Sequence, residues 1–539
     1  MSLNNRLISP ESSRLSVFIN DKPVPDKVRL LRLYAGDYLT LKVEITSKKS
    51  WDEFLLHTDL GGSWSYLSFN KDETDESCYT LELKIAGAGE FCFRYAASDE
   101  NSLYWEPAPY HRLLADPAVM DGLTMYTLIP NVSGPVSAWS RKLPEIAAMG
   151  FNTIHLLPVT MMGSSESPYS AADLFSLDPA WGKDIGDFKT FAKEASAAGI
   201  MLCLDMVLNH ISIDNPVCTK HADWLIPDDQ RPDGLKRAGC WHHRDWISWE
   251  DLVLINYDHP VNTVRAEIYD YMRSYIDYWI EASGGKDIMI RLDNLHSSNQ
   301  PFIGWLLPEI RLKWPDVIIL SEYFGAEDHL NEAVQTFGLN LLMANSWEYP
   351  FAPVLQNYLS GLHSPETSAK YLIEPSSHDT GSIPELFGSV SSSIPRYLCC
   401  ALMGTGQTGI IQGFEYGAAE KINFIGRIPE KRPEAEWNFT GMISAVNNIL
   451  HEYPCFRKKG NIVFLETGCD SLIACRRTGE GAEFIIAVNL DTGAQHDLYI
   501  NSGNRFQFIL SENVERESTD NKIVLKACGV CVLKNIITV

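Results

Sequence analysis

Several apolar runs in the sequence end in polar side chains that are able to do acid–base chemistry. The run DIMIRLD ends in Arg291 and Asp293 and continues directly into Asn294 and His296. Charged groups and amides are costly to bury unless they are paired or used in function. Comparable residues follow other apolar runs, namely Asp205, Asn209 and His210, then Glu322, and then His378 and Asp379. If these runs are neighbouring strands, the polar groups meet at one site.

Carboxylates, an arginine and histidines gathered at one site fit the cleavage of a glycosidic bond. One carboxylate would act as the nucleophile, one carboxylic acid would protonate the leaving oxygen, and the other groups would hold the distorted ring. Each residue also has a structural interpretation, because an Asp or Glu at a strand end often caps a helix and a lone His often belongs to a core. Several separate runs with the same kind of ending favour the catalytic interpretation for the set.

The elements that must position these residues alternate between strand and helix. From about residue 120, eight short apolar runs are separated by segments of helical period, such as VRAEIYDYMRSYIDYWI. Alternation of this kind predicts parallel strands with right-handed crossovers, and eight units predict a closed (β/α)₈ barrel of the α/β class. An open α/β sheet is the alternative, but no glycine-rich phosphate loop follows the first run. In a barrel, the ends of the runs converge on one mouth.

Two strand-rich segments flank the predicted barrel. Residues 1–117 contain runs such as YLTLKVEI, in which apolar and polar residues alternate, and they predict an N-terminal β-sandwich. Residues 118–455 form the predicted barrel, with a long irregular insertion at 211–261 after the third strand. Residues 456–539 predict a C-terminal all-β domain, a second β-sandwich.

The composition restricts the class of partner. The net charge of −24 argues against nucleic acid and anionic membranes, because both need a basic face. The first residues lack the apolar stretch of a secretory signal, and no run approaches the length of a membrane span. The 12 cysteines have no regular spacing and predict reduced thiols in a cytoplasmic protein. The oligomeric state is left open.

Four segments carry a resemblance to a known family. DMVLNH, IRLDNLH, LSEYF and PSSHDT resemble, in order, the signature segments of the α-amylase superfamily, glycoside hydrolase family 13. The resemblance implies that Asp293 is the nucleophile, Glu322 the general acid/base, and Asp379 the carboxylate that grips the sugar in the transition state. It also implies that Arg291 pairs with the nucleophile, that Asp205, His210 and His378 line the site of the cleaved sugar, and that Tyr169 stacks on that sugar.

The residues after the nucleophile differ from those of ordinary amylases. The Asp-Asn-x-His pattern made by Asn294 and His296 is similar to the 4-α-glucanotransferase half of the eukaryotic-type glycogen debranching enzyme. It is also similar to maltosyltransferases that use maltose 1-phosphate. The segment HLLPVTMMGSSESPYSAADLFSLDP further resembles the debranching enzyme. We therefore expect Asn294 and His296 to face the acceptor sugar, with capping of the following turn as the alternative for Asn294.

The resemblance implies a retaining enzyme that cleaves α-1,4-glucosidic bonds through a covalent glycosyl-enzyme. We favour a 4-α-glucanotransferase acting on glycogen or maltooligosaccharides, with an α-amylase-like hydrolase as the alternative, because water and a sugar hydroxyl compete for the same intermediate. A maltosyltransferase would need a basic phosphate pocket, for which Lys183, His242, His243 and Arg244 are candidates. A non-catalytic glucan-binding protein would be expected to lack one of the carboxylates.

No cofactor is required by this chemistry, and none of the predicted site residues is assigned to a metal. The resemblance leaves calcium binding open, because Asn209 matches a calcium ligand of many amylases.

Overall fold

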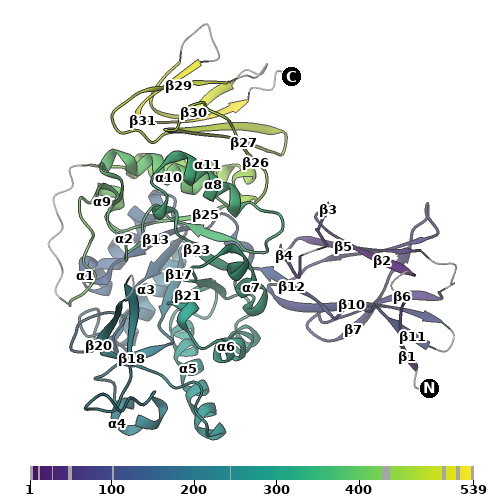
Figure 1. The fold of residues 1–539 in the computed structure, drawn as a ribbon, viewed down its shortest axis with the longest axis horizontal. Helices are drawn as coiled ribbons and strands as arrows, with labels where there is room; N and C mark the ends of the chain where they lie inside the picture. The colour runs from purple at the N-terminus through teal and green to yellow at the C-terminus, as the bar shows by residue number, and fades with distance from the viewer. Residues whose placement is uncertain are drawn as a thin grey trace.

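The computed structural model arranges the chain as a central barrel with a strand-rich part on each side (Figure 1). It describes residues 4–9, 12–26, 28–46, 51–99, 102–242, 245–427, 437–500, 506–516 and 522–535. In the part of the chain so described, no helix is both long enough and apolar enough to cross a bilayer.

The N-terminal part consists of two sheets packed face to face. One sheet has the order β1-β11-β10-β12-β4, with β6 and β7 added beside β10, and the other has the order β3-β2-β5-β9-β8. Alternation in β5 buries Leu39, Leu41 and Val43 completely against the opposite sheet. The strands are β1 Asn4–Leu7, β2 Ser13–Ile19, β3 Lys22–Pro23, β4 Leu30–Tyr34, β5 Tyr38–Ile45, β6 Glu53–Thr58, β7 Ser65–Ser68, β8 Asn70–Lys71, β9 Cys78–Lys84, β10 Gly89–Asp99, β11 Ser102–Trp105 and β12 His111–Asp116.

The central part is a closed barrel of eight parallel strands, which confirms the predicted fold class. Each of the eight apolar runs supplies one strand. They are β13 Thr124–Leu128, β14 Thr153–Leu156, β17 Met201–Met206, β21 Ile288–Leu292, β22 Ile318–Ser321, β23 Leu341–Ala344, β24 Tyr371–Ile373 and β25 Gln407–Ile411. These runs are apolar throughout because both faces of a barrel strand are buried, one against the barrel interior and one against the helices.

Helices surround the barrel and connect its strands. They are α1 Pro130–Ser133, α2 Val136–Ala148, α3 Ile185–Ala197, α5 Asn262–Ala282, α6 Gln300–Lys313, α7 Glu327–Phe337, α8 Ala352–Leu362, α9 Ile383–Phe387, α10 Ser393–Leu402 and α11 Thr440–Glu452. Short 3₁₀ helices are η1 Ala118–Met120, η2 Ala222–Trp224, η3 Leu295–Ser297, η4 Ser346–Glu348, η5 Val390–Ser392, η6 Phe414–Tyr416 and η7 Pro454–Arg457. In α5, the apolar residues at helical spacing include Ile268, Met272 and Ile276, all of which are buried.

The insertion after the third barrel strand is more regular than the sequence predicted. It contains an antiparallel sheet of order β18-β20-β19, formed by β18 His210–Ser212, β19 Arg237–His242 and β20 Asp245–Leu254, together with α4 Val217–Lys220. The expectation of an irregular segment was wrong because tryptophan, isoleucine and valine residues in β20 favour a strand even without strict alternation. A hairpin of β15 Thr160–Met162 and β16 Ala171–Leu177 lies after the second barrel strand.

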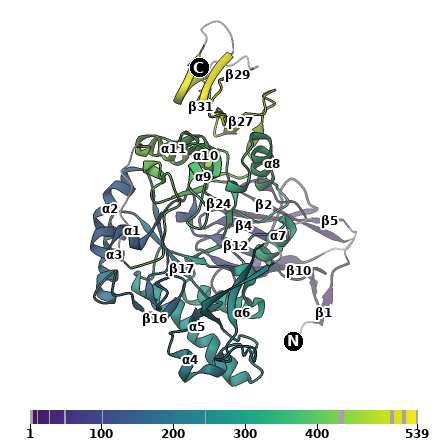
Figure 2. The same cartoon turned by 60° about the vertical axis from the view of Figure 1, so that its left-hand side comes forward.

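The C-terminal part is a six-stranded antiparallel sheet of order β26-β27-β28-β31-β29, in which β30 also pairs with β31. Its strands are β26 Ile462–Phe464, β27 Leu472–Gly479, β28 Ala482–Asn489, β29 His496–Tyr499, β30 Phe506–Arg516 and β31 Lys522–Asn535. One face contributes Ile473, Ile486 and Val532 to the core shared with the barrel helices. Both views place this sheet beside α10 and α11 (Figures 1 and 2).

A buried ion cluster joins the N-terminal sandwich to the barrel. The carboxylate of Asp116, on β12, is fully buried and accepts from Arg32 of β4 at 2.6 Å and from Lys370 of the barrel at 2.7 Å. Asn340 of the barrel donates to the same carboxylate at 2.8 Å. Arg32 also donates to the carbonyl oxygens of the barrel residues Leu339 and Ser368. Removing one partner of such a cluster costs about 3–5 kcal/mol, so the junction is stiff.

Candidate active site

The predicted site residues come together at the carboxyl ends of the barrel strands. Asp205 on β17 is in register with Arg291 on β21, and Leu292 is in register with Ser321 on β22. Asp293 and Glu322 therefore follow at the same level of the barrel. Their backbones are fixed as well, because the N–H of Asp293 donates to the Met206 carbonyl at 3.0 Å and that of Glu322 to the Leu292 carbonyl at 3.1 Å.

One guanidinium holds three of the carboxylates. Nη1 of Arg291 lies 2.7 Å from Asp293 Oδ1 and 2.9 Å from both carboxylate oxygens of Asp205. Nη2 lies 2.6 Å from Glu322 Oε2. The side chain of Arg291 is only 1% exposed, so these charges interact with little screening by water. The resemblance implied the contact with Asp293, whereas the contacts with Asp205 and Glu322 were not foreseen.

Burial and this charge cluster perturb the two aspartates in opposite directions. Burial raises the pKa of Asp293 well above its ordinary value, and the charges of Glu322, Asp205 and Asp379 add to the rise while Arg291 opposes it. Burial also acts to raise the pKa of Asp205, but Arg291 and His155 outweigh it, so the pKa of Asp205 is lowered. The neighbours of Asp205 thus favour its ionised form, whereas the surroundings of Asp293 favour protonation.

Asp205 lies at the centre of a buried polar network. The hydroxyl of Tyr169 donates to Asp205 Oδ2 at 3.0 Å and lies 2.7 Å from His378 Nε2. The ring of Tyr169 is stacked on that of His378, at 5.8 Å between centroids and 6° between planes. Nε2 of His155 lies 3.2 Å from Asp205 Oδ2, and its Nδ1 lies 3.1 Å from Thr127 Oγ1. His155 was not predicted, because it lies inside the second apolar run and not after it.

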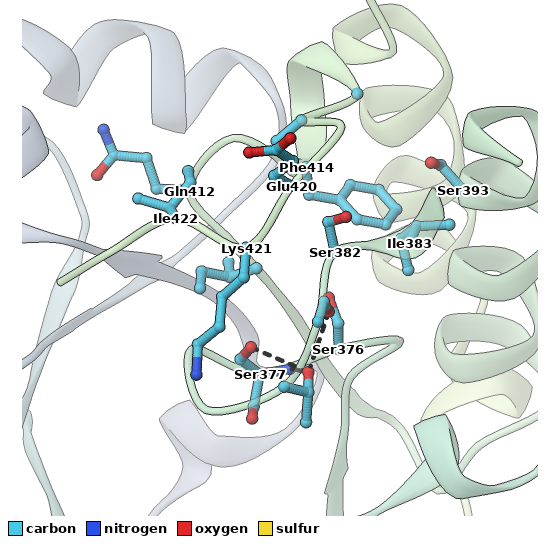
Figure 3. A pocket seen from close by; sticks show the side chains of 15 residues that line it. Ser376, Ser377, Ser382, Ile383, Ser393, Gln412, Phe414, Glu420, Lys421 and Ile422 are labelled. Carbon is cyan, nitrogen blue, oxygen red and sulfur yellow. Dashed lines mark hydrogen bonds between the residues drawn. The ribbon is translucent and has the colours of Figure 1, made fainter. Parts of the chain in front are cut away.

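Asp379 lies at the rim of the site and is half-exposed. His378 Nε2 lies 3.0 Å from its Oδ2. Burial acts to raise the pKa of Asp379, but His378, Arg291 and Lys421 outweigh it and hold the pKa well below its usual range. Lys421 donates to the Asp379 carbonyl oxygen at 2.7 Å, and Figure 3 shows its side chain extending towards Ser377 past a small cavity of about 30 Å³. Asp379 therefore carries a stable negative charge.

His210 is buried beside the same network and is neutral. Burial lowers the pKa of His210 to about 4, although a hydrogen bond to the Tyr169 carbonyl opposes the shift. Because that carbonyl can only accept, Nε2 of His210 carries the hydrogen and donates across 3.1 Å. The neutral ring positions the loop that carries Tyr169.

Asn294 and His296 both line the pocket that contains Asp293 and Glu322. The backbone of Asn294 is in the left-handed region (φ 45°), which Asn tolerates better than most residues, and its N–H donates to Glu322 Oε2 at 2.9 Å. Its side chain makes no capping hydrogen bond to η3, so the capping alternative is wrong. His296 is exposed, with its ring 6.0 Å from that of Tyr323.

These residues open onto a pocket of about 580 Å³. Its described lining consists of Ser165, Ser167, Tyr169, His210, Cys240, Trp249, Asp251, Leu252, Asp293, Asn294, His296, Glu322, Asp379, Phe424 and Ile425. The insertion sheet supplies Cys240 and Trp249, and the segment after β25 supplies Phe424. These residues of the pocket wall were not predicted, because no sequence pattern indicated where either segment lies relative to the barrel.

Comparison with known proteins agrees with this arrangement. Residues 117–232 match the family model for the glucanotransferase domain of glycogen debranching enzyme. A maltosyltransferase of Picrophilus torridus, described as acting between α-1,4-glucan and maltose 1-phosphate, is 24% identical over 71% of this chain. The same description applies to a protein of Myxococcus xanthus, 25% identical over 66% of this chain. The alignments span 62% and 56% of those relatives, so the chain corresponds to about three-fifths of their length.

Solved structures share the fold over most of the chain. An α-amylase from Geobacillus thermoleovorans superposes with a TM-score of 0.64 at 17% identity, covering 78% of this chain and 99% of that one. A cyclomaltodextrinase superposes with a TM-score of 0.64 at 16% identity and covers 97% of this chain and 99% of that one. The chain thus has the fold of these α-amylase superfamily structures, and its residues 117–232 are similar to the glucanotransferase domain of glycogen debranching enzyme.

Calcium is bound by many members of the α-amylase superfamily, but the described residues here do not fit it. Oδ1 of Asn209 is buried and accepts no hydrogen bond. Within the described ranges, no group of three or more His, Cys, Asp or Glu residues could hold a metal ion. One amide oxygen falls far short of the roughly six to eight oxygens that calcium prefers.

Of the four basic residues that are candidates for a phosphate pocket, the structure describes the side chain of Lys183. Lys183 is exposed just before α3 and is not a lining residue. His243 and Arg244 lie outside the described residues, as does the side chain of His242. Among the described lining residues there is no lysine and no arginine.

Proposed function

We propose that this chain is a retaining transferase that acts on α-1,4-linked glucans. The observation that carries the proposal is the single buried guanidinium of Arg291, which holds Asp293 and Glu322 at the floor of a pocket large enough for several sugar atoms. Two carboxyl groups that flank the scissile bond, one to attack the anomeric carbon and one to protonate the leaving oxygen, are the requirement of retaining glycoside chemistry.

In the first step, Asp293 attacks the anomeric carbon and forms a covalent ester while the glycosidic C–O bond breaks. Glu322 gives its proton to the departing oxygen. In the second step, an acceptor hydroxyl attacks the ester, Glu322 takes the acceptor's proton, and Asp293 leaves as a carboxylate. Asp379, which His378 keeps ionised, lies at the rim of the pocket to bind the hydroxyls of the distorted sugar.

The contacts of Glu322 leave one of its oxygens free for the proton. Arg291 Nη2 and the N–H of Asn294 both donate to Oε2, at 2.6 and 2.9 Å. An oxygen that accepts from two donors is a poor place for a proton, so the proton is carried by Oε1. This oxygen belongs to a residue of the pocket lining, where a leaving oxygen would lie.

The acid limb of the pH profile is the first consequence of this assignment. Burial and the neighbouring carboxylates raise the pKa of Asp293, and the nucleophile must be ionised. Acidification should therefore abolish kcat/KM at a pH above the ordinary aspartate pKa of about 3.9. The profile is measured with maltoheptaose, and circular dichroism over the same range checks that the protein stays folded. A limb at or below pH 4 would contradict the assignment.

Transfer and hydrolysis differ only in what attacks the ester. Incubation with maltoheptaose, with products resolved by length, tests the proposal. Transfer gives chains both longer and shorter than the starting length at a constant number of reducing ends. Short products with rising reducing ends mean hydrolysis, and no cleavage at all would overturn both.

Maltosyl transfer from maltose 1-phosphate is the second candidate. Its support is the description of the curated relatives, which name this sugar phosphate. The described pocket lining offers histidine but no lysine or arginine to the phosphate, and the candidates His243 and Arg244 lie outside the described residues. Release of inorganic phosphate from maltose 1-phosphate with a glucan acceptor, at a rate above maltoheptaose cleavage, would reverse this order.

His296→Ala is expected to shift the balance from transfer towards hydrolysis. His296 is exposed in the pocket and can hydrogen-bond an acceptor sugar. Such a bond is worth about 0.5–1.5 kcal/mol, so the transfer-to-hydrolysis ratio should fall by roughly 2- to 13-fold. The ratio is read from the maltoheptaose products. His329→Ala, an exposed histidine on α7, is the matched control, and equal ratios in the two variants would remove the role of His296.

A further inference from the structure

An aromatic cluster covers the outer face of one sheet of the N-terminal sandwich. It consists of His57, Trp64, Tyr66, Trp105 and Tyr110, with Arg94 beside them. His57 on β6 lies opposite Tyr66 of β7 on one side and Arg94 of β10 on the other. Trp64 and Tyr66 are 51% and 50% exposed, which is unusual for rings of this size. Figure 1 shows β6 and β11 at the end of the sandwich that is far from the barrel.

The rings hold one another in fixed orientations. The ring of His57 stacks on Trp64 at 4.7 Å and 23°, and contacts Tyr66 at 4.6 Å and 37°. Tyr110 meets Trp64 edge-on at 5.3 Å, and its hydroxyl lies 2.7 Å from His57 Nδ1. Trp64, His57 and Tyr66 therefore form one contiguous row of rings. Because this surface is organised before any ligand binds, little side-chain entropy is lost on binding.

The cation beside the cluster, Arg94, is held against its rings. Nε of Arg94 donates to the Glu106 carbonyl at 3.0 Å, and its guanidinium lies over the rings of Trp105 and Tyr110 at 5.5 and 5.9 Å. Burial lowers the pKa of His57, so its ring is neutral at neutral pH. The whole chain carries a net charge of −24, which disfavours anionic ligands. A neutral ligand with flat apolar faces and polar edges matches this surface.

We propose that this aromatic cluster is a second binding site for an α-glucan chain, separate from the pocket at the barrel mouth. The C–H face of a pyranose ring packs on an aromatic face, while the N–H and O–H edges of Trp64 and Tyr66 are able to bind sugar hydroxyls. The choice of α-glucan among neutral sugar chains rests on the proposed function. The cluster would keep the enzyme on a long glucan between reaction cycles.

A second copy of the chain fits this surface less well. A stable protein interface buries about 800 Å² on each partner around an apolar centre. On this face, the large apolar side chains exposed among the described residues are Trp64, Tyr66 and Leu7, which is paired with Trp105, and other exposed residues beside the rings are small ones such as Gly61, Gly62 and Ser63. Three side chains supply less area than a stable dimer needs but enough for one or two sugar rings.

The test is native gel electrophoresis of the full chain in gels with and without glycogen. The double variant Trp64→Ala/Tyr66→Ala is compared with Tyr38→Ala/Tyr499→Ala, which removes two exposed rings elsewhere. Two lost ring contacts should weaken glycogen retardation by about 5- to 150-fold in apparent affinity. Activity on maltoheptaose, which is short enough to be used at the pocket alone, should stay at the wild-type level in both variants.

Three results decide the matter. Equal retardation of the two double variants overturns the proposal. A change in apparent mass on gel filtration in Trp64→Ala/Tyr66→Ala, with retardation intact, overturns it in favour of self-association. If this variant unfolds, Trp64→Phe/Tyr66→Phe should be retarded nearly as much as wild type, and full loss of retardation in that folded variant also overturns the proposal. A chain that is inactive on maltoheptaose but retarded through Trp64 and Tyr66 would refute the proposed function and leave this site standing.

Discussion

Glu322→Gln is expected to lower turnover of maltoheptaose by about 10²- to 10⁴-fold, the usual contribution of a general acid. The amide keeps the bonds from Arg291 and Asn294 to one oxygen but has no proton to give to the leaving oxygen. A substrate with a good leaving group, such as maltosyl fluoride, needs no proton in the first step. Its glycosyl-enzyme should therefore still form, and binding of maltoheptaose should change little.

Glu327→Gln is the matched control for this variant. Glu327 lies on the same connection after β22, at the exposed start of α7, and should leave both rates unchanged. Equal loss by Glu322→Gln on maltoheptaose and maltosyl fluoride would show that Glu322 is not the proton donor. Both substrates are measured as initial rates and as a pre-steady-state burst of the leaving group.

Arg291→Met is expected to reduce both activity and stability. Methionine fills part of the space but leaves Asp205, Asp293 and Glu322 without a counter-charge. Loss of an electrostatic group of this kind lowers kcat by at least about 10²- to 10³-fold. Breaking a buried ion pair costs about 3–5 kcal/mol in the free energy of unfolding, because the remaining charges stay buried.

The stability loss should depend on pH in a defined direction. In the wild type the pKa of Asp205 is lowered, so its contribution to stability is present above the unfolded pKa and is lost as the pH falls. In Arg291→Met the unpaired buried carboxyls take up protons more readily, so the folded state is favoured at low pH and loses stability as the pH rises. The difference between the two proteins should be largest near pH 7 and shrink below about pH 4.

Urea unfolding at several pH values measures this difference. Arg273→Met is the control, because Arg273 makes only partly exposed ion pairs with Asp270 and Glu309 on the surface. Exposed pairs contribute about 0–1 kcal/mol, so this variant should track the wild type at all pH values. A pH-independent loss in Arg291→Met would mean that Arg291 acts through packing and not through its charge.

The barrel and the main site residues could be predicted because the chain carries two plain signals. Runs that are apolar throughout mark strands buried on both faces, and helical periodicity between them implies parallel neighbours whose carboxyl ends meet. Asp205, Asp293 and Glu322 each follow such a run, so their convergence needs no knowledge of side-chain packing.

Other parts of the site could not be predicted, because they depend on how segments far apart in the chain pack. Trp249 and Phe424 come from an insertion sheet and from the segment after the last barrel strand, neither of which is in register with the barrel. The triple contact of Arg291 depends on side-chain geometry that spacing does not specify. His155 lies between apolar residues of β14, so its position in the sequence did not indicate that it belongs to the site.

The buried junction at Asp116 bears on how the two proposed glucan sites would work together. Because Arg32, Lys370 and Asn340 tie the sandwich to the barrel, the aromatic cluster and the pocket are held at a constant separation. If the two sites were joined by a flexible tether, glucans of many lengths could bind both sites at once. With a rigid connection, a glucan too short to span the distance between the sites gains no affinity from the second site. The enzyme would thus distinguish glucans by length. A glucan above a threshold length would bind at both the aromatic cluster and the pocket, and a shorter one would bind at the pocket alone.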